Sequence, residues 1–161
     1  MPHEDLAHTI EAAWEDRANV GPTTQGPVRE AVDAALARPG FAVGLGTGNV
    51  REGARIKLAR VGLADRFAFG GFGCDHENRV ELIRQGARGG ADRLGVPVAS
   101  CRVVIIGDTP KDVDAAKGIG AECIGVGTGQ YTPEALLEAG ADHAFADFTV
   151  REALPTLLGE R

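Results

Sequence analysis

The chain has 161 residues, of which 43% are hydrophobic and 25% charged, and its formal net charge is -6. This length supports one globular domain with a core of ordinary size. The acidic balance and the absence of a basic cluster argue against a nucleic-acid partner. No apolar run approaches the roughly 20 residues of a membrane span, and the first residues lack a signal-peptide pattern, so we expect a cytoplasmic protein with no membrane partner.

The first part of the sequence predicts two helices and a linker. Apolar residues at helical spacing favour helices over residues 4–18 and 28–38, and residues 19–27 are rich in turn formers. We therefore divide the chain into residues 1–26, a helix with its linker, and residues 27–161, an α/β core.

A buried strand is predicted at residues 41–46, and it leads into Thr47-Gly48-Asn49. A hydroxyl and free backbone N–H groups at the tip of a parallel strand can bind an anion. The same residues also suit an ordinary helix cap with a tight turn. The local sequence alone favours neither interpretation.

The middle of the chain predicts a helix up to Gly62, a short strand at residues 67–69, a glycine-rich loop at 70–73 and a helix that begins near Arg79. Gly86, Gly89 and Gly90 each weaken that last helix by about 1 kcal/mol relative to alanine. The sequence offers no physical reason for this concentration of glycines. The three cysteines have no metal-type spacing and are predicted to be small buried residues in a reducing compartment.

Two carboxylates follow the most apolar strand. Residues 103–106 are β-branched, Gly107 allows a turn, and Thr109 and Pro110 are typical of a helix start. Asp108 and Asp112 are then placed at the carboxyl end of a parallel strand, where oxygen ligands suit Mg²⁺. A helix start alone explains an acid at Asp112, but it does not explain Asp108. Lys117 and Gly118 are predicted to end the helix.

The remaining sequence alternates strands and helices. Strands are predicted at residues 121–126 and 142–145, a helix from Thr132 to Gly140, and a last helix opened by a capping box at Thr149 and Glu152. This alternation predicts a parallel sheet covered on both faces.

The run G-D-T-P-K-D-V-D-A-A at residues 107–116 resembles the fourth motif of the haloacid dehalogenase-like (HAD-like) hydrolases, in its phosphatase form. The similarity extends over about residues 28–158 and is closest to phosphoglycolate-phosphatase-like members. It implies a three-layer Rossmann-like core, Mg²⁺ at Asp108 and Asp112, and a small phosphorylated metabolite as substrate. The helix and linker at residues 1–26 would then be a remnant of the cap.

Two further motifs of that family are similar to segments of this chain. L-G-T-G-N at residues 45–49 resembles the second motif, which implies that Thr47, Gly48 and Asn49 bind the substrate phosphate. Arg79 stands where the family places a Lys, less often Arg, that neutralises phosphate and carboxylate charge. This third match is one of position and charge only, since an exposed Arg on a helix is common.

The family's aspartate nucleophile, in a D-x-D-G-T-type motif after the first strand, is not found. No acid before Thr47 follows an apolar β run. The resemblance therefore implies that the first strand and most of the cap are missing. In the family this strand lies between the strands predicted here at 41–46 and 102–106. These two must then pair directly, or another segment or chain must fill the gap, which includes a homo-oligomer formed through the sheet.

Two hypotheses of function follow from these motifs. The chain is a Mg²⁺-dependent phosphatase of a small phosphate ester, inactive or impaired because its nucleophile is absent. Alternatively, it is a non-catalytic HAD-like binding or interaction module.

Overall fold

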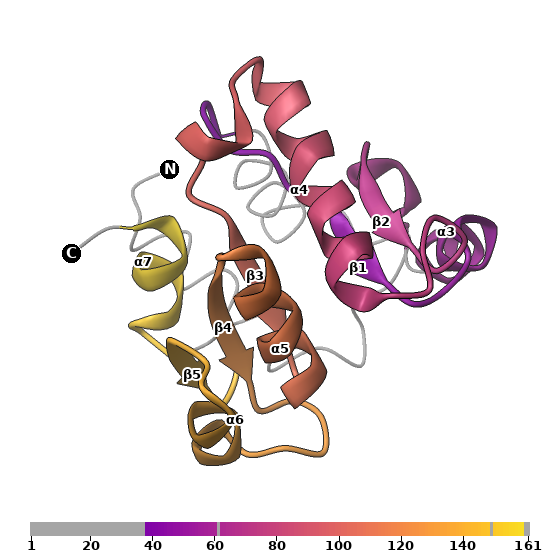
Figure 1. Cartoon of the computed structure of the whole chain (residues 1–161). Coiled ribbons are helices and arrows are strands. Elements are labelled where there is room, and N and C mark those ends of the chain that lie inside the picture. Colours follow the sequence, from indigo (N-terminus) through magenta and orange to yellow (C-terminus); the bar gives the residue numbers. More distant parts are fainter. Residues whose placement is uncertain (1–37, 61, 149, 160–161) are drawn as a thin grey trace.

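The computed structural model of the chain describes residues 38–60, 62–148 and 150–159, and five strands are found among these residues. The strands are β1 (Leu45–Thr47), β2 (Gly70–Phe72), β3 (Val104–Gly107), β4 (Glu122–Val126) and β5 (His143–Phe145). The helices of the same part of the chain are α3 (Arg51–Ala59), α4 (Arg79–Leu94), α5 (Pro110–Ile119), α6 (Pro133–Ala139) and α7 (Ala153–Leu158) (Figure 1). All strand pairs are parallel, which confirms the predicted α/β class.

The sheet of β3, β4 and β5 contains the densest part of the core. Val113 of α5 and Leu136 of α6 pack against Cys123 of β4, and all three are at most 1% exposed. Ile105 of β3 lies opposite Cys123 in the ladder and joins the same cluster. The helices that follow β3 and β4 therefore cover one face of this sheet (Figure 1).

α4 packs on the small sheet of β1 and β2 through glycines. A Cβ at Gly71 would overlap the backbone carbonyl of Leu82, and a Cβ at Gly86 would lie 3.2 Å from the Gly71 nitrogen. At Gly89 and Gly90 it would lie 3.2 Å from the Phe69 side chain. The helix glycines that weaken α4 by propensity thus let its backbone approach β2 closely, which supplies the reason that the sequence did not.

Three predicted boundaries were wrong. The strand predicted at residues 67–69 forms instead at Gly70–Phe72, inside the predicted glycine-rich loop. The strand predicted at 41–46 is paired only at Leu45–Thr47. The helix predicted to end at Gly118 continues to Ile119, and the left-handed residue is Gly120, with φ 69°. Gly118 is needed for packing instead, since a Cβ there would lie 2.6 Å from Val80.

Other expectations concern single residues or lie outside the described part. Cys123 is buried as predicted, but Cys74 is exposed. The helices predicted at residues 4–18 and 28–38 and the proposed boundary at residue 26 lie outside the described residues, as does Thr149. The last helix begins only at Ala153, with Glu152 before it. No helix among the described residues is long and apolar enough to cross a membrane.

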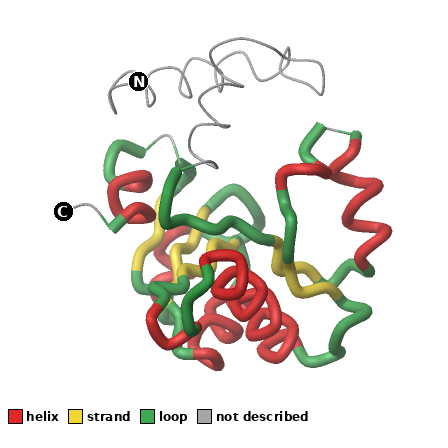
Figure 2. Tube along the Cα trace, turned by 90° about the horizontal axis from the view of Figure 1, so that it is seen from above, coloured by secondary structure: helices red, strands yellow, loops and turns green. Residues whose placement is uncertain are grey.

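The two sheets do not join within the described residues. β1 pairs with β2, β3 pairs with β4, and no ladder connects β1 with β3. Figure 2 shows the two groups of strands as separate. α4 follows β2 and precedes β3, and its residue Ile83 lies against Gly46 of β1 and in one apolar cluster with Ile105 of β3. The direct pairing of these strands, one of the predicted alternatives, is therefore wrong.

Candidate functional site

β1 ends in a polar turn that is held from both sides. The Thr47 hydroxyl oxygen accepts hydrogen bonds from the Asn49 backbone nitrogen at 3.1 Å and from its side-chain amide at 2.9 Å. Lys57 of α3 donates to the Asn49 side-chain oxygen at 2.9 Å. Gly73 donates to the Asn49 carbonyl at 2.9 Å. Since both bonds to Thr47 use its lone pairs, its O–H remains a free donor at the tip of the strand.

Arg79 is the first residue of α4 and points away from the helix. Asn78 caps this helix by accepting from the Val80 nitrogen at 2.9 Å, which fixes the backbone beside Arg79. The Arg79 guanidinium forms an ion pair with Asp112 through Nη2 and Oδ1. Its Nε is buried and has no hydrogen-bond partner among the residues that the structure describes. A buried guanidinium N–H without an acceptor is costly, so this position favours a ligand oxygen.

Asp112 is fixed by the start of α5 as well as by Arg79. Its Oδ2 accepts from the Thr109 backbone nitrogen at 3.2 Å and from the Thr109 hydroxyl at 2.9 Å. A Cβ at Gly107 would overlap the Asp112 side chain, so this position of the carboxylate requires glycine at the end of β3. The predicted cap at Thr109 and Pro110 is confirmed, and Asp112 is 7% exposed. Its carboxylate therefore orients Arg79.

Asp108 has a different environment. It follows β3 directly, is half-buried, and makes no hydrogen bond to the described residues. A Cβ at Gly129 would overlap its carboxylate, so the loop after β4 passes directly over Asp108. Gly129 is a residue that the motif reasoning missed, since no sequence pattern links it to residue 108. Asp108 thus presents, at the carboxyl end of the sheet, a half-buried carboxylate that makes no hydrogen bond to the described residues.

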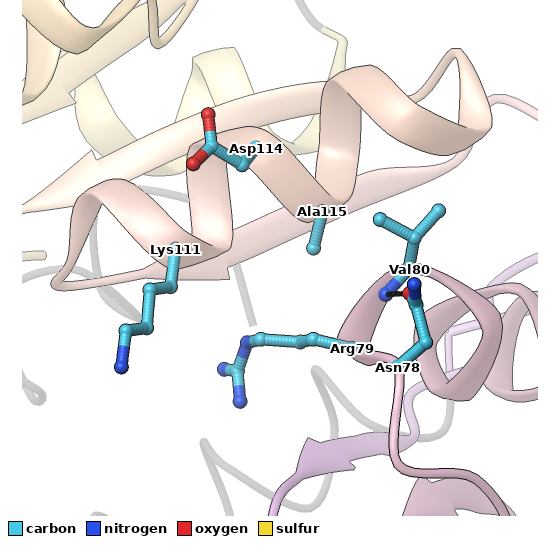
Figure 3. Close-up of a pocket in the computed structure, with 6 residues that line it drawn as sticks. All are labelled: Asn78, Arg79, Val80, Lys111, Asp114 and Ala115. Carbon is cyan, nitrogen blue, oxygen red and sulfur yellow. Dashed lines mark hydrogen bonds between the residues drawn. The ribbon is translucent and has the colours of Figure 1, made fainter.

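A hollow of about 250 Å³ lies between the first turns of α4 and α5, and Figure 3 shows the side chains that line it. It is lined by Asn78, Arg79, Val80, Lys111, Asp114 and Ala115. The side chains of Arg79 and Lys111 point toward the same open space, so two cations are presented beside the ends of two helices. Lys111 was not among the predicted site residues. A Lys in the first turn is unfavourable because it opposes the helix dipole, and this unfavourable placement is the sequence feature that could have identified Lys111 as a site residue.

The structure joins some of the predicted site residues and leaves others apart. Arg79 and Asp112 form one unit, and Thr47, Gly48 and Asn49 form another. Within the described residues, no hydrogen bond or ion pair connects the Thr47 turn with Asp108 or Asp112. Thr47 ends β1, whereas Asp112 lies on the helix that follows β3, and these two strands belong to separate sheets.

Mg²⁺ prefers oxygen ligands and commonly uses one or two carboxylates together with substrate phosphate. No group of three His, Cys, Asp or Glu side chains in the described part of the chain is arranged to hold a metal ion. Asp108 fits a direct ligand because its oxygens accept no hydrogen bond from the described residues. Asp112 already accepts from Arg79 and twice from Thr109. Its role as a second metal ligand stays a prediction.

Comparison with known proteins agrees with the motif at residues 107–116. Residues 83–152 match a family model described as HAD-hydrolase-like. A crystal structure described as a β-phosphoglucomutase from Thermotoga maritima is 27% identical and has a TM-score of 0.61. The superposition covers 92% of this chain and 68% of that one. The chain therefore has a HAD-like fold, and residues 83–152 are similar to the HAD-hydrolase-like family. The predicted Rossmann-like, HAD-like fold is thereby confirmed.

A second group of matches concerns a shorter stretch. The 2,3,4,5-tetrahydropyridine-2,6-dicarboxylate N-succinyltransferases of Methylobacterium nodulans and Methylobacterium sp. are 84% and 78% identical to this chain over 37 residues. This is 23% of this chain and 13% of each transferase. The chain thus spans about an eighth of the length of these curated relatives, which is too little of the transferases to carry their activity over to the HAD-like core.

Proposed function

We propose that this HAD-like chain binds the phosphate group of a small phosphate ester, as a phosphatase-type protein. Thr47, Gly48, Asn49 and Arg79 would hold the phosphate, and Asp108 would hold Mg²⁺ against it. The observation that carries the proposal is Arg79, whose buried Nε lacks an acceptor while Nη2 is held by Asp112. A phosphate oxygen would satisfy Nε, and arginine recognises phosphate through more than one N–H.

Two further groups support the binding of an anionic ligand. The Thr47 hydroxyl keeps its proton free to donate, and Lys111 lies beside Arg79 in the same hollow. Mg²⁺ would neutralise phosphate charge and polarise a phosphoryl oxygen. Because the chain is acidic, with a net charge of -6, we further propose a soluble phosphorylated metabolite in the cytoplasm, and not a nucleic acid, as the ligand.

Turnover by the family's route needs a carboxylate that accepts the phosphoryl group, and no D-x-D-G-T-type motif occurs in the sequence. We therefore propose that binding is retained and hydrolysis is impaired or absent. The second candidate, a non-catalytic binding or interaction module, is favoured by the same observation. Measurement of turnover decides between the two.

The experiment measures binding of inorganic phosphate by calorimetry, with and without Mg²⁺. Arg79→Lys keeps the charge but removes Nε as a donor, and it is expected to weaken binding about tenfold or more, since hydrogen bonds to charged groups contribute about 1.5–3 kcal/mol. Arg88→Ala, on the exposed side of the same helix, is the matched control and leaves binding unchanged. Equal affinity of Arg79→Lys and the unaltered chain would contradict the proposal.

A second pair of variants examines the turn after β1. Thr47→Val removes the hydroxyl at nearly constant volume, and Thr47→Ser keeps it. Only the valine variant is expected to bind phosphate more weakly. For turnover, release of phosphate from p-nitrophenyl phosphate with Mg²⁺ is measured for the unaltered chain and Asp108→Asn. Hydrolysis that Asp108→Asn abolishes would exclude the non-catalytic alternative.

A further inference from the structure

The loop between β4 and α6, residues 127–132, is fixed at both of its ends (Figure 1). At its start, the Gly127 nitrogen donates to the Phe145 carbonyl of β5 at 2.8 Å, and a Cβ at Gly127 would lie 2.8 Å from the Pro133 side chain. At its end, the Thr132 hydroxyl caps α6 by accepting a backbone N–H of the first turn at 3.3 Å. Both β4 and α6 contribute residues to the buried core. The backbone of this loop therefore has little freedom to move.

The strand register brings this loop onto Asp108. Gly107, the last residue of β3, pairs with Gly125 of β4, so the chain leaves both parallel strands at the same edge of the sheet. A Cβ at Gly129 would overlap Oδ2 of Asp108 and would lie 3.1 Å from its Cγ. The φ of Gly129 lies outside the left-handed region. Glycine is therefore required at this position because space is short, and not because of the backbone conformation.

The loop contacts only one side of the Asp108 carboxylate. The atoms nearest to the Cβ position of Gly129 are Oδ2, Cγ and Cβ of Asp108, and Oδ1 lies farther away than these. Asp108 is half-buried, and neither of its oxygens accepts a hydrogen bond from the described residues. Oδ1 is thus on the side away from the loop, where it remains available to a ligand.

An added methyl group at residue 129 would displace the side chain of Asp108 and not the loop. At Gly71 the obstacle to a Cβ is the backbone carbonyl of Leu82, which cannot rotate away. At Gly129 the obstacle is the end of a side chain with two rotatable bonds. Rotation about these bonds relieves the overlap at a small cost in stability, but it turns the carboxylate away from its present direction.

We propose that Gly129 is a positioning residue for Asp108. Because Gly129 has no side chain, the loop backbone can hold the carboxylate with Oδ1 available to the metal ion. A metal ligand whose direction is fixed in advance binds more tightly than one that can rotate. The inference rests on the proposed role of Asp108 as an Mg²⁺ ligand, and it adds a residue that acts through Asp108 alone.

The experiment measures binding of Mn²⁺ alone, a spectroscopic substitute for Mg²⁺, to the full chain by electron paramagnetic resonance of the free ion. Gly129→Ala is expected to weaken binding about tenfold or more, since loss of a residue that orients a metal ligand commonly has this effect. The urea midpoint of this variant should stay close to that of the unaltered chain. Equal Mn²⁺ affinity of Gly129→Ala and the unaltered chain would overturn the proposal.

Two controls examine whether the effect is specific to this contact. Gly53→Ala adds the same methyl group where it meets only Val50 at 3.4 Å, and Gln130→Ala changes the neighbouring, exposed loop residue. Both controls should bind Mn²⁺ as the unaltered chain does. A loss in either control as large as that in Gly129→Ala would also overturn the proposal.

A measurement on the unaltered chain makes the test independent of how the variant folds. Bound Mn²⁺ broadens the NMR signals of nearby amides, and we expect strong broadening at both Asp108 and Gly129. Excess Mg²⁺ should restore both signals, because the two ions compete for the same ligand. Broadening that leaves these two amides unaffected would place the ion elsewhere and contradict the positioning role.

Asp108→Asn separates this inference from the proposed function. If Asp108→Asn loses Mn²⁺ binding but Gly129→Ala retains it, only the positioning role of Gly129 fails. If Asp108→Asn retains Mn²⁺ binding, the metal role of Asp108 and the inference fail together. Phosphate binding by Arg79 is measured separately, and its absence would leave the positioning role of Gly129 in place.

Discussion

In the sheet of β3, β4 and β5, side chains fill the space between strands and helices, whereas on the sheet of β1 and β2 the backbone of α4 itself lies against the strands. Leu136 and Ile124 are 0% exposed in the first sheet. In the second, Gly70 and Gly71 make up most of β2, and Gly86 of α4 faces Gly71. One parallel sheet is thus stabilised by side-chain burial and the other by close backbone approach.

This difference matters because the candidate site takes residues from both parts. Thr47 ends the glycine-packed sheet, while Asp108 and Asp112 follow the side-chain-packed one. Arg79 lies on α4, which contacts both sheets, and its ion pair to Asp112 links α4 to α5. A change that loosens one sheet should therefore alter the site without unfolding the other.

The largest effect is expected where side chains fill the core. Leu136→Ala removes a fully buried side chain and should lower the free energy of unfolding by about 2–5 kcal/mol. Leu137→Ala, the next residue on α6, is 46% exposed and should change it by less than about 0.5 kcal/mol. Urea denaturation of both variants measures the difference. Similar losses would contradict the assignment of the core to this sheet.

In the second sheet, adding one methyl group should also lower the free energy of unfolding, here because the added group overfills a close contact. Gly71→Ala places a Cβ on the Leu82 carbonyl, which is backbone and cannot rotate away, and should cost about 1–3 kcal/mol. Gly53→Ala in α3 meets only Val50 at 3.4 Å and should stabilise by roughly 1 kcal/mol. Amide exchange should accelerate at β1 and β2 more than at β4. Uniform acceleration would mean that the two sheets unfold as one unit.

The same contrast explains how much of this fold the sequence predicts. The strand β3, the capped start of α5 and the helix from Thr132 to Gly140 follow from β-branched runs, N-cap residues and stop signals, which are local. β2 was misplaced because its residues, Gly70–Phe72, have low strand propensity. They form a strand because α4 must approach closely there, and such tertiary contacts leave no local pattern.

The site divides in the same way. The motif at residues 107–116 predicts Asp108, Asp112 and their neighbours directly, and the first residue of α4 was correctly identified as Arg79. What the sequence could not show is that Asp112 is engaged by Arg79 and by Thr109, or that Gly129 lies over Asp108. The contacts of Arg79 with Asp112 and of Gly129 with Asp108 join residues 33 and 21 positions apart, and neither spacing nor residue type encodes them.

Two of the three cysteines, Cys123 of β4 and Cys74 after β2, distinguish the two sheets by their chemistry. Burial, then the charges of Asp112 and Asp142, raises the pKa of the Cys123 thiol from 9.0 to about 11. The folded state therefore holds this proton more tightly, and the stabilisation is present below pH 9 and is lost between pH 9 and about 11. The loss should be about 1.4 kcal/mol per pH unit in that window, as an upper limit. Cys123→Ala should flatten this part of the pH profile relative to the unaltered chain.

Thiol labelling gives an independent measurement of the same contrast. Cys74, exposed just after β2, should react with a maleimide in the folded chain, while Cys123 should react only after unfolding. Labelling of Cys123 at the rate of Cys74 without denaturant would show that β4 is not the protected strand that its burial indicates.

The smallest effect is expected at the outer end of the larger sheet, where one arginine attaches a short helix. Arg102 donates to the carbonyls of Thr156 at 3.0 Å and Leu157 at 2.7 Å, and it also pairs with Glu122. Because Arg102 is 41% exposed on its side chain, Arg102→Ala should cost only about 1 kcal/mol. The loss should be local, since α7 has six residues and its last carbonyls have few other donors. Limited proteolysis should cut the variant at α7 first.

The Arg102→Lys variant keeps the charge but not the planar arrangement of donors, so it should protect α7 from proteolysis only partly. Full protection by the lysine variant would mean that charge alone attaches the helix.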